Sequence, residues 1–139
     1  MFDGCLYFNG TALARLLERE WSRAFAPFEL SPPQGFMLRS IVERPGLLQR
    51  ELAEALTISR PTATRLLDGL ERKGLVRRVV AAEDRRESLI HPSAAALKLG
   101  PALNAASGQV TRRLKQLLGA EAFDQTVALV RAANTQLKA

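Results

Sequence analysis

The side chains best suited to binding chemistry lie on one face of a predicted helix near residues 60–72. On that face stand the guanidinium, hydroxyl and carboxylate groups of Arg60, Thr62, Thr64, Arg65, Asp68 and Arg72. Arginine donates hydrogen bonds in a planar fork that fits phosphate groups and the edge of guanine, and threonine hydroxyls can bond to either. The face is therefore short, polar and mostly basic, which favours an anionic partner such as a nucleic acid.

Catalytic and metal-binding chemistry finds little support in the same sequence. The chain contains one cysteine and one histidine, which leaves most metal sites without enough ligands. We find no paired carboxylate setting, no glycine-rich phosphate loop and no nucleophile with a nearby histidine. His91 is best explained as a structural residue. The sequence predicts neither an enzyme nor a cofactor or metal site.

The basic face belongs to the second of two short predicted helices. The opposite face of this helix is apolar at the 3, 4 and 7 spacing of a helix stripe, with Ala63, Leu66, Leu67 and Leu70. Ser59 is placed to cap the helix, and Pro61 falls in the first turn, where its missing N–H costs nothing. Gly74 stands where the helix should stop.

A shorter helix is predicted just before it, over about residues 49–56. Its inward-facing residues are Leu52, Ala53 and Leu56. Thr57 and Ile58 then make a connection short enough for a helix-turn-helix.

A hairpin is predicted directly after the second helix. Residues 75–80 are β-prone, residues 81–85 are polar and charged, and residues 87–91 can return as a strand. Because Pro92 has no N–H to donate, we expect the second strand to stop at His91. A helix-turn-helix followed by such a hairpin is a winged helix, which places its second helix in the major groove and its wing near the minor groove. The alternative is a solvated basic helix followed by an ordinary hairpin.

Length and composition fit one domain with an anionic partner. The chain of 139 residues is long enough for one domain with a hydrophobic core, and 47% of the residues are hydrophobic. Lys and Arg number 20 against 14 Asp and Glu, which gives a formal net charge of +6. No stretch approaches the roughly 20 apolar residues of a membrane span, and no signal peptide is recognised. With a single cysteine, a reducing, cytoplasmic location without membrane contact is expected.

Helices are predicted at both ends of the chain, outside the segment that a winged helix needs. A helix-turn-helix with its wing needs about 60 to 70 residues, here about residues 31–92 of a single domain spanning 1–139. Apolar residues recur at helical spacing within about 1–28 and 94–139. Gly100 and Pro101 predict a kink or break in the helix after the wing. The apolar stripes predict two-fold dimerisation, which would place two recognition helices one DNA turn apart.

The sequence resembles the MarR family of transcriptional regulators over nearly all of its length. The resemblance rests on SPPQGFMLRSIVERPG for the family's second helix, QRELAEALTISRPTATRLLDGLERKGLVRR for the helix-turn-helix, and EDRRESLIHPS for the wing. The sequence departs from the family pattern at Leu48, where Thr or Ser often caps the first helix of the motif. The resemblance implies a mainly α fold with a small β-wing, in which a winged helix-turn-helix core is flanked by N- and C-terminal dimerisation helices.

The resemblance also implies a function and the residues that carry it. The chain is expected to be a homodimeric repressor that binds a pseudo-palindromic DNA duplex and is released by a small aromatic or phenolic effector. In the wing, Arg86 is expected to reach the minor groove while Asp84 braces it. The predicted DNA-binding residues are Ser59, Arg60, Pro61, Thr62, Thr64, Arg65, Arg72, Asp84, Arg85 and Arg86.

Two further sets of residues are candidates for sensing a signal. Cys5, with Tyr7 two residues away, is a candidate redox or electrophile sensor, and the alternative is an inert, packed thiol. The aromatic residues Trp21, Phe25 and Phe36 are candidates for a ligand pocket between the dimer helices and the DNA-binding lobe, although most aromatic residues there should be core. A different class of function also stays open, a winged helix that binds protein and not DNA. Such a module should carry an acidic or apolar recognition face.

Overall fold

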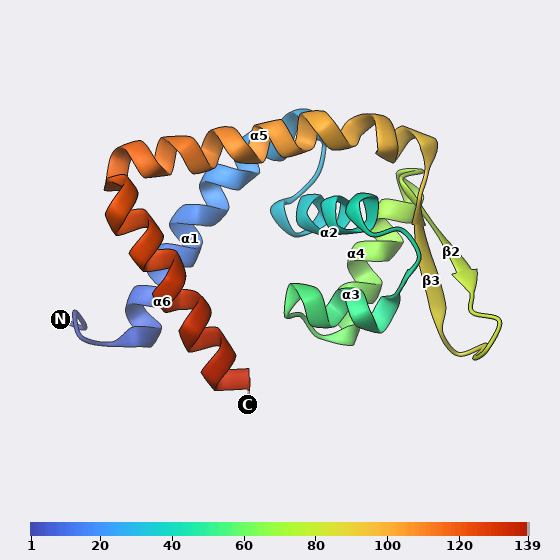
Figure 1. The fold of residues 1–139 in the computed structure, drawn as a ribbon, viewed down its shortest axis with the longest axis horizontal. Coiled ribbons are helices and arrows are strands. Elements are labelled where there is room, and N and C mark those ends of the chain that lie inside the picture. Colours follow the sequence, from blue (N-terminus) through green and yellow to red (C-terminus); the bar gives the residue numbers. More distant parts are fainter. Residues whose placement is uncertain (139) are drawn as a thin grey trace.

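The computed structural model describes residues 1–138. The elements in chain order are α1 (Leu6–Phe25), a 3-10 turn η1 (Ala26–Phe28), α2 (Pro32–Glu43), β1 (Leu47–Leu48), α3 (Gln49–Leu56), α4 (Arg60–Arg72), β2 (Val76–Val80), β3 (Ser88–Pro92), α5 (Ala94–Leu118) and α6 (Ala120–Lys138). Together they form an arch (Figure 1), with α5 along the top and α1 and α6 descending on one side. A lobe made of α2, α3, α4 and the strands hangs from the other end of α5.

The helix-turn-helix forms as its local sequence predicts. The Ser59 side chain accepts a hydrogen bond from the Thr62 N–H at 3.2 Å, and so caps α4, with Pro61 in the first turn. Thr57 adopts a left-handed conformation, with φ of 56°, at the end of α3. Gly74 follows α4 with φ of 73°, a region that costs glycine little. The predicted mainly α fold with a winged helix-turn-helix core is confirmed. The predicted domain boundaries and the role of the flanking helices in dimerisation stay predictions.

The wing belongs to a three-stranded antiparallel sheet in the order β1-β3-β2. The prediction that the second wing strand stops at His91 was wrong, because β3 includes Pro92, which pairs with Val76 of β2. The next N–H, of Ser93, donates to the Leu75 carbonyl on the β2 side at 2.9 Å. Since successive N–H groups of a strand point to opposite edges, the donor that Pro92 lacks belongs to the β1 side. There β1 pairs only with Leu89 and Ile90, so no ladder bond is lost.

A single hydrophobic core ties the lobe to α1 and α5. Its largest fully buried side chains are Phe25, Met37, Leu38, Ile41, Leu52, Leu67, Leu70, Ile90 and Leu103. Two glycines allow the helices to approach closely. A Cβ on Gly35 would lie 2.4 Å from the Phe25 ring, and a Cβ on Gly100 would lie 3.2 Å from Val42 Cγ1. These positions therefore set how tightly α2 packs against its neighbours.

The two long flanking helices are more regular than the sequence suggests. α1 begins at Leu6 and continues through Asn9 and Gly10. α5 runs from Ala94 to Leu118 without a break at Pro101, so the expected break is absent. In a regular helix the N–H at this position would bond to the Leu97 carbonyl. Both residues are exposed, so water can satisfy that carbonyl.

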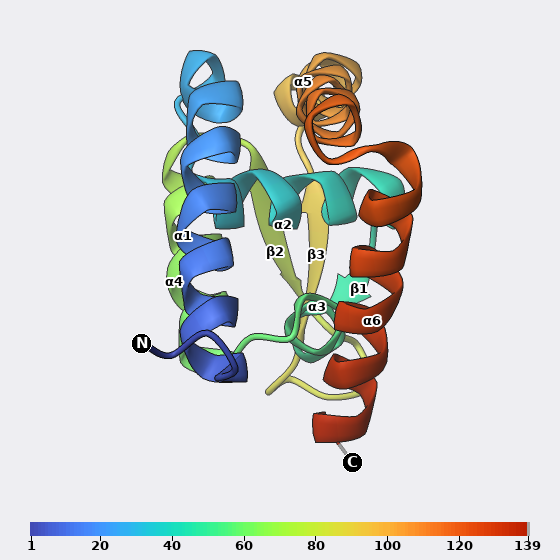
Figure 2. The same ribbon diagram turned by 90° about the vertical axis from the view of Figure 1, so that its left-hand side faces the viewer.

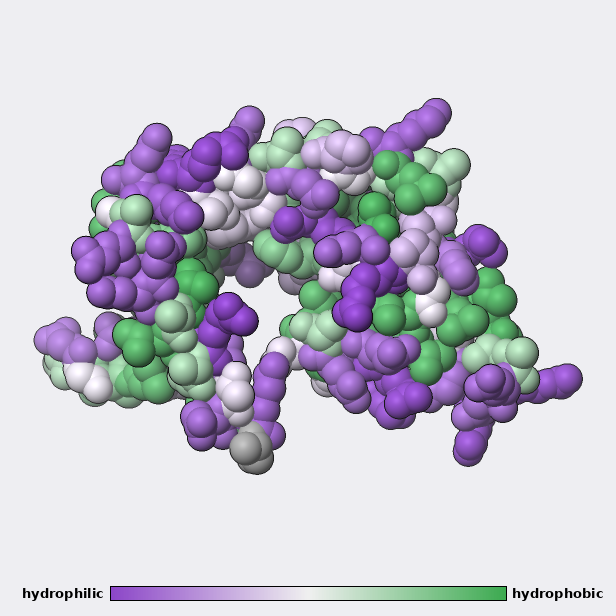
Figure 3. Space-filling model, in the orientation of Figure 1, coloured by the Kyte–Doolittle hydropathy of each residue, from purple (hydrophilic) through white to green (hydrophobic). Residues whose placement is uncertain are grey.

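The flanking helices leave much of their apolar surface exposed in the single chain. No residue of α6 within the described range is buried. The large exposed hydrophobic side chains of α1, the end of α5 and α6 are Leu6, Tyr7, Phe8, Leu13, Leu16, Leu117, Leu118, Val127, Leu129, Val130 and Leu137. Figure 2 shows α1 and α6 as separate columns, and Figure 3 shows apolar surface on the side of the arch that they form. Exposed apolar area of this extent marks an interaction surface.

Candidate nucleic-acid interface

The outer face of α4 is basic and open to solvent. Arg60, Arg65 and Arg72 are all exposed, while the opposite face of the helix buries Ala63 and Leu67 in the core. The Arg65 guanidinium lies 3.3 Å from the Thr62 hydroxyl, so it rests along the helix surface. Pro61 and Ser59 are also exposed at the N-terminal end of α4. The first turns of α4 therefore present arginine and hydroxyl donors together on one surface.

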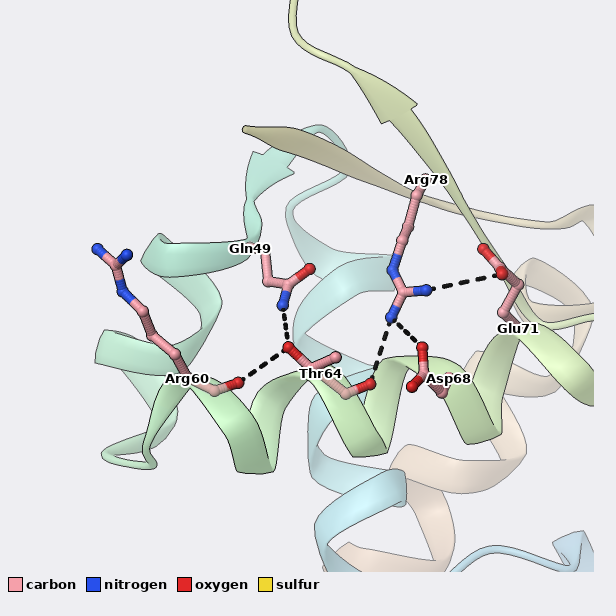
Figure 4. Close-up of polar contacts among 6 residues, drawn as sticks. All are labelled: Gln49, Arg60, Thr64, Asp68, Glu71 and Arg78. Atoms are coloured by element: carbon pink, nitrogen blue, oxygen red, sulfur yellow. Dashed lines mark hydrogen bonds and ion pairs between the residues drawn. The ribbon is translucent and has the colours of Figure 1, made fainter. Parts of the chain in front are cut away.

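Thr64 is held by its neighbours rather than projecting freely (Figure 4). Its hydroxyl donates to the Arg60 carbonyl at 3.1 Å and accepts a hydrogen bond from Gln49 Nε2 at 2.8 Å. Gln49 opens α3, so this bond joins the two helices of the motif. Thr64 thus orients α4 against α3 in addition to lying on its exposed face.

Arg78 of β2 holds the other end of the recognition helix (Figure 4). Its Nη2 lies 2.8 Å from Asp68 Oδ1 and 3.3 Å from the Thr64 carbonyl oxygen, and its Nη1 lies 3.6 Å from Glu71 Oε1. A bond to a charged, partly buried carboxylate is stronger than a neutral one. Sequence reasoning missed Arg78, because it lies ten positions after Asp68 and the turn that brings strand and helix together falls between them. The available signal was a pair of arginines, Arg77 and Arg78, between the valines of a β-prone run.

The wing contains the predicted contact between Asp84 and Arg86. Asp84 Oδ1 accepts hydrogen bonds from the Arg86 backbone N–H at 3.0 Å and from Arg86 Nε at 3.3 Å. The Arg86 side chain remains 91% exposed, so the contact orients it without burying it. Arg85 is exposed in the same turn, and Glu87 lies 3.6 Å from Arg50 Nε at the start of α3. The DNA-binding role of these wing residues stays a prediction.

A polar cluster links α1, α2 and α5 beside the predicted aromatic residues. The buried Ser107 hydroxyl accepts hydrogen bonds from Trp21 Nε1 and Arg39 Nη1, both at 3.0 Å. Arg39 Nε also donates to Asn104 Oδ1 at 2.7 Å. Burial lowers the pKa of Arg39 from its ordinary value, and Glu43 opposes the shift. An arginine keeps its charge at neutral pH in any case, so the cluster holds a cation between the lobe and the flanking helices.

The three aromatic residues predicted for a pocket lie together but differ in exposure. The Phe36 ring centre is 6.2 Å from that of Trp21 and 5.9 Å from that of Phe25. Phe25 is fully buried in the core, whereas Phe36 is 37% exposed. Phe36 borders a hollow of about 580 Å³ whose other lining residues are Arg39, Ser40, Val42, Glu43 and Asn104. Of the predicted trio, only Phe36 lines this hollow.

The candidate sensor residues lie at the beginning of α1. Cys5 is a free, exposed thiol at the N-cap position, and Tyr7 is 79% exposed in the first turn. Positions two apart on a helix do not face each other. Within residues 1–138, no hydrogen bond joins the two side chains. Sensing by Cys5 stays a prediction.

These features define a winged-helix protein with a basic recognition helix, and comparison with known proteins agrees. Residues 30–88 match the family model described as MarR family. The S. aureus MepR-DNA complex has a TM-score of 0.83 at 25% identity, covering 94% of this chain and 97% of that chain. CouR, a transcriptional repressor bound to a 23-mer DNA duplex, has a TM-score of 0.82 at 26% identity, covering 96% and 94%.

A third similar structure contains a ligand. PcaV, a transcriptional regulator from Streptomyces coelicolor in complex with its natural ligand, has a TM-score of 0.77 at 25% identity, covering 88% of this chain and 89% of that chain. The match to the MarR family model over residues 30–88 agrees with the resemblance found in the sequence. None of the helices in residues 1–138 is both long and apolar enough to cross a membrane.

Proposed function

We propose that this chain is a transcriptional regulator that binds double-stranded DNA through α4 and the wing. The observation that carries the proposal is the exposed basic face of α4, held in place by bonds to Gln49 of α3 and Arg78 of β2. A helix that enters the major groove needs donors on its outer face and a rigid attachment on its inner face. The similar structures of MepR and CouR, both with DNA, support the same use of the fold.

The regulator acts as a homodimer on a pseudo-palindromic site. The support is the apolar surface that α1, the end of α5 and α6 leave exposed. A two-fold symmetric pair buries that surface and presents two copies of α4 and the wing to the two halves of one DNA site. This arrangement suits a repressor, because an occupied site blocks access of other proteins to the same DNA.

A small aromatic or phenolic effector releases the regulator from DNA. The support is the hollow beside Phe36 and Arg39, which offers an aromatic face and a cation at the contact between the lobe and α5. A ligand changes the affinity for DNA only if it binds the dimer more tightly at one spacing of its two DNA-binding lobes, one from each chain, than at another. The ligand-bound PcaV structure supports the presence of effector sites in proteins with this fold.

The exposed face of α4 argues against a winged helix that binds protein and not DNA. Such a module should present acidic or apolar side chains on this helix, whereas Arg60, Arg65 and Arg72 stand there. The net charge of +6 supports an anionic partner as well.

The test begins with selection of bound genomic DNA fragments by the purified protein, followed by binding titrations on the selected duplex. If Arg65 reaches a guanine edge, Arg65→Ala should weaken binding to the selected duplex by about 1–3 kcal/mol more than it weakens binding to unrelated duplexes. Arg86→Ala should lower affinity for the selected duplex, because a wing contact is lost. Lys98→Ala, an exposed charge change on α5, is the matched control. Unchanged affinity in both arginine variants would refute the assignment of the DNA face.

A further inference from the structure

A small polar hollow lies between α3, α4 and the wing. Arg60, Thr64 and Arg86 of its lining belong to the predicted DNA-binding set, whereas Arg50 does not. Its volume is about 190 Å³, the scale of a single small ionic group with its water. Its lining residues are Gln49, Arg50, Ala53, Arg60, Thr64, Arg86, Glu87 and Ser88. The hollow therefore sits at the meeting point of both helices of the motif and the strand that ends the wing.

The lining of this hollow carries an excess of positive charge. Arg50, Arg60 and Arg86 supply three cations from three different elements, and Glu87 supplies one carboxylate, which leaves a net charge of two positive. Arg50 lies 3.6 Å from Glu87, and Arg86 lies 3.3 Å from Asp84 outside the lining. The Arg60 guanidinium extends away from α4 in Figure 4 and forms no hydrogen bond or ion pair with another of residues 1–138. Because like charges repel one another, three cations that line one hollow favour an anion between them.

The start of α3 adds to the same electrostatic preference. Leu48 precedes α3 and has no side-chain acceptor for the first helical N–H groups, although its own N–H donates to Glu51 Oε1 at 2.9 Å. The exposed N–H groups at a helix start carry a partial positive charge. The Gln49 amide is already engaged with Thr64, which keeps this side of the hollow in a fixed shape.

We propose that this hollow binds one phosphate group of the DNA backbone, with Arg50 as its principal ligand and Arg60 and Arg86 on either side. The inference rests on the proposed function, because the phosphate belongs to the duplex that α4 and the wing contact. When the major groove of a DNA duplex receives α4 and the adjacent minor groove faces the wing, the phosphate backbone that separates the two grooves lies between α4 and the wing. Arg50 thereby fixes the register of the duplex and leaves base choice to other residues.

A plain structural role for Arg50 makes the opposite prediction for one substitution. If the pair of Arg50 and Glu87 serves only to join α3 to the wing, removing either charge weakens DNA binding alike. If a phosphate occupies the hollow, Glu87 competes with it for Arg50 and repels it. In that case Arg50→Ala weakens binding, whereas Glu87→Gln strengthens it.

The experiment measures DNA affinity against salt concentration for the full-length parent, Arg50→Ala, Glu87→Gln and the charge-matched control Lys98→Ala. Each protein is titrated with the selected duplex and with an unrelated duplex of equal length. Arg50→Ala should reduce the slope of log affinity against log salt by about 0.9, equally for both duplexes. Raising the salt fourfold should then weaken the parent about 3.5-fold more than the variant. Glu87→Gln should bind both duplexes more tightly than the parent.

The outcomes separate this inference from the proposed function. A parent that binds DNA while Arg50→Ala behaves like Lys98→Ala would overturn the phosphate site and leave the proposed function standing. Weakening by Glu87→Gln would assign Arg50 to the structural pair. A different outcome would assign the hollow to a free phosphate ion. In that case Arg50→Ala has the same salt slope as the parent, and inorganic phosphate at constant ionic strength changes the DNA affinity of the parent but not that of Arg50→Ala. A parent that binds no duplex overturns both.

Discussion

Replacing Arg78 with alanine tests whether the wing holds the recognition helix in place. Arg78 on β2 bonds to the Asp68 carboxylate at 2.8 Å and to the Thr64 carbonyl at 3.3 Å. The substitution leaves both acceptors on α4 without this donor. The adjacent Arg77 is exposed and its side chain points to the opposite face of the strand, so Arg77→Ala is a control with the same charge change.

The magnitude follows from the exposure of the two partners. A hydrogen bond to a charged group contributes about 1.5–3 kcal/mol when well shielded. The Arg78 side chain is 23% exposed and that of Asp68 is 45% exposed, so solvent screens part of the interaction. The Glu71 pair at 3.6 Å adds little. The expected loss of stability is smaller again because Arg78 Nε is buried with no hydrogen-bond partner among residues 1–138, and the substitution removes that unfavourable group. We expect Arg78→Ala to lower the free energy of unfolding by about 1–2 kcal/mol.

Urea unfolding, followed by circular dichroism at one fixed protein concentration, measures this loss. With an m-value of about 2 kcal/mol per M, the midpoint should fall by about 0.5–1 M. Arg77→Ala should shift the midpoint by much less, because surface substitutions change stability by no more than about 0.5 kcal/mol. Equal midpoints for the two variants would refute the argument that Arg78 anchors α4 to the sheet.

Two further predictions concern assembly and sensing. Deleting residues 119–139 should convert the protein to a monomer or an aggregate, because the exposed apolar side chains of α6 would no longer be available to a partner subunit. Light scattering measures the oligomeric state. A soluble monomer that still binds a full palindrome tightly would contradict the dimer. If Cys5 senses oxidants, peroxide should release the parent from DNA while Cys5→Ser stays bound, because only an accessible thiol can be oxidised. Full oxidation of Cys5 by mass spectrometry without DNA release would make the thiol a bystander.

The features that the sequence determined by itself are those set by residues close along the chain. Ser59 and Thr62 are three residues apart, so the cap of α4 could be predicted from spacing and side-chain type. The contact between Asp84 and Arg86 spans two residues, and it was expected from the resemblance to the MarR family. The apolar stripe of α4 decided which of its faces is buried, and therefore which face is basic and exposed.

The tertiary structure decided everything that depends on contacts between distant segments. Pro92 continues β3 because the donor it lacks points to the side where β1 is too short to need it, and no local pattern reveals the position of β1. Arg39 and Trp21 meet on Ser107 across 68 and 86 residues, which only the packing of α1 and α2 on α5 brings about. The hollow around Arg50 exists for the same reason, because its charges come from two helices and a wing whose relative positions are set by the shared core. Local sequence specifies the donors, and long-range packing determines which of them converge.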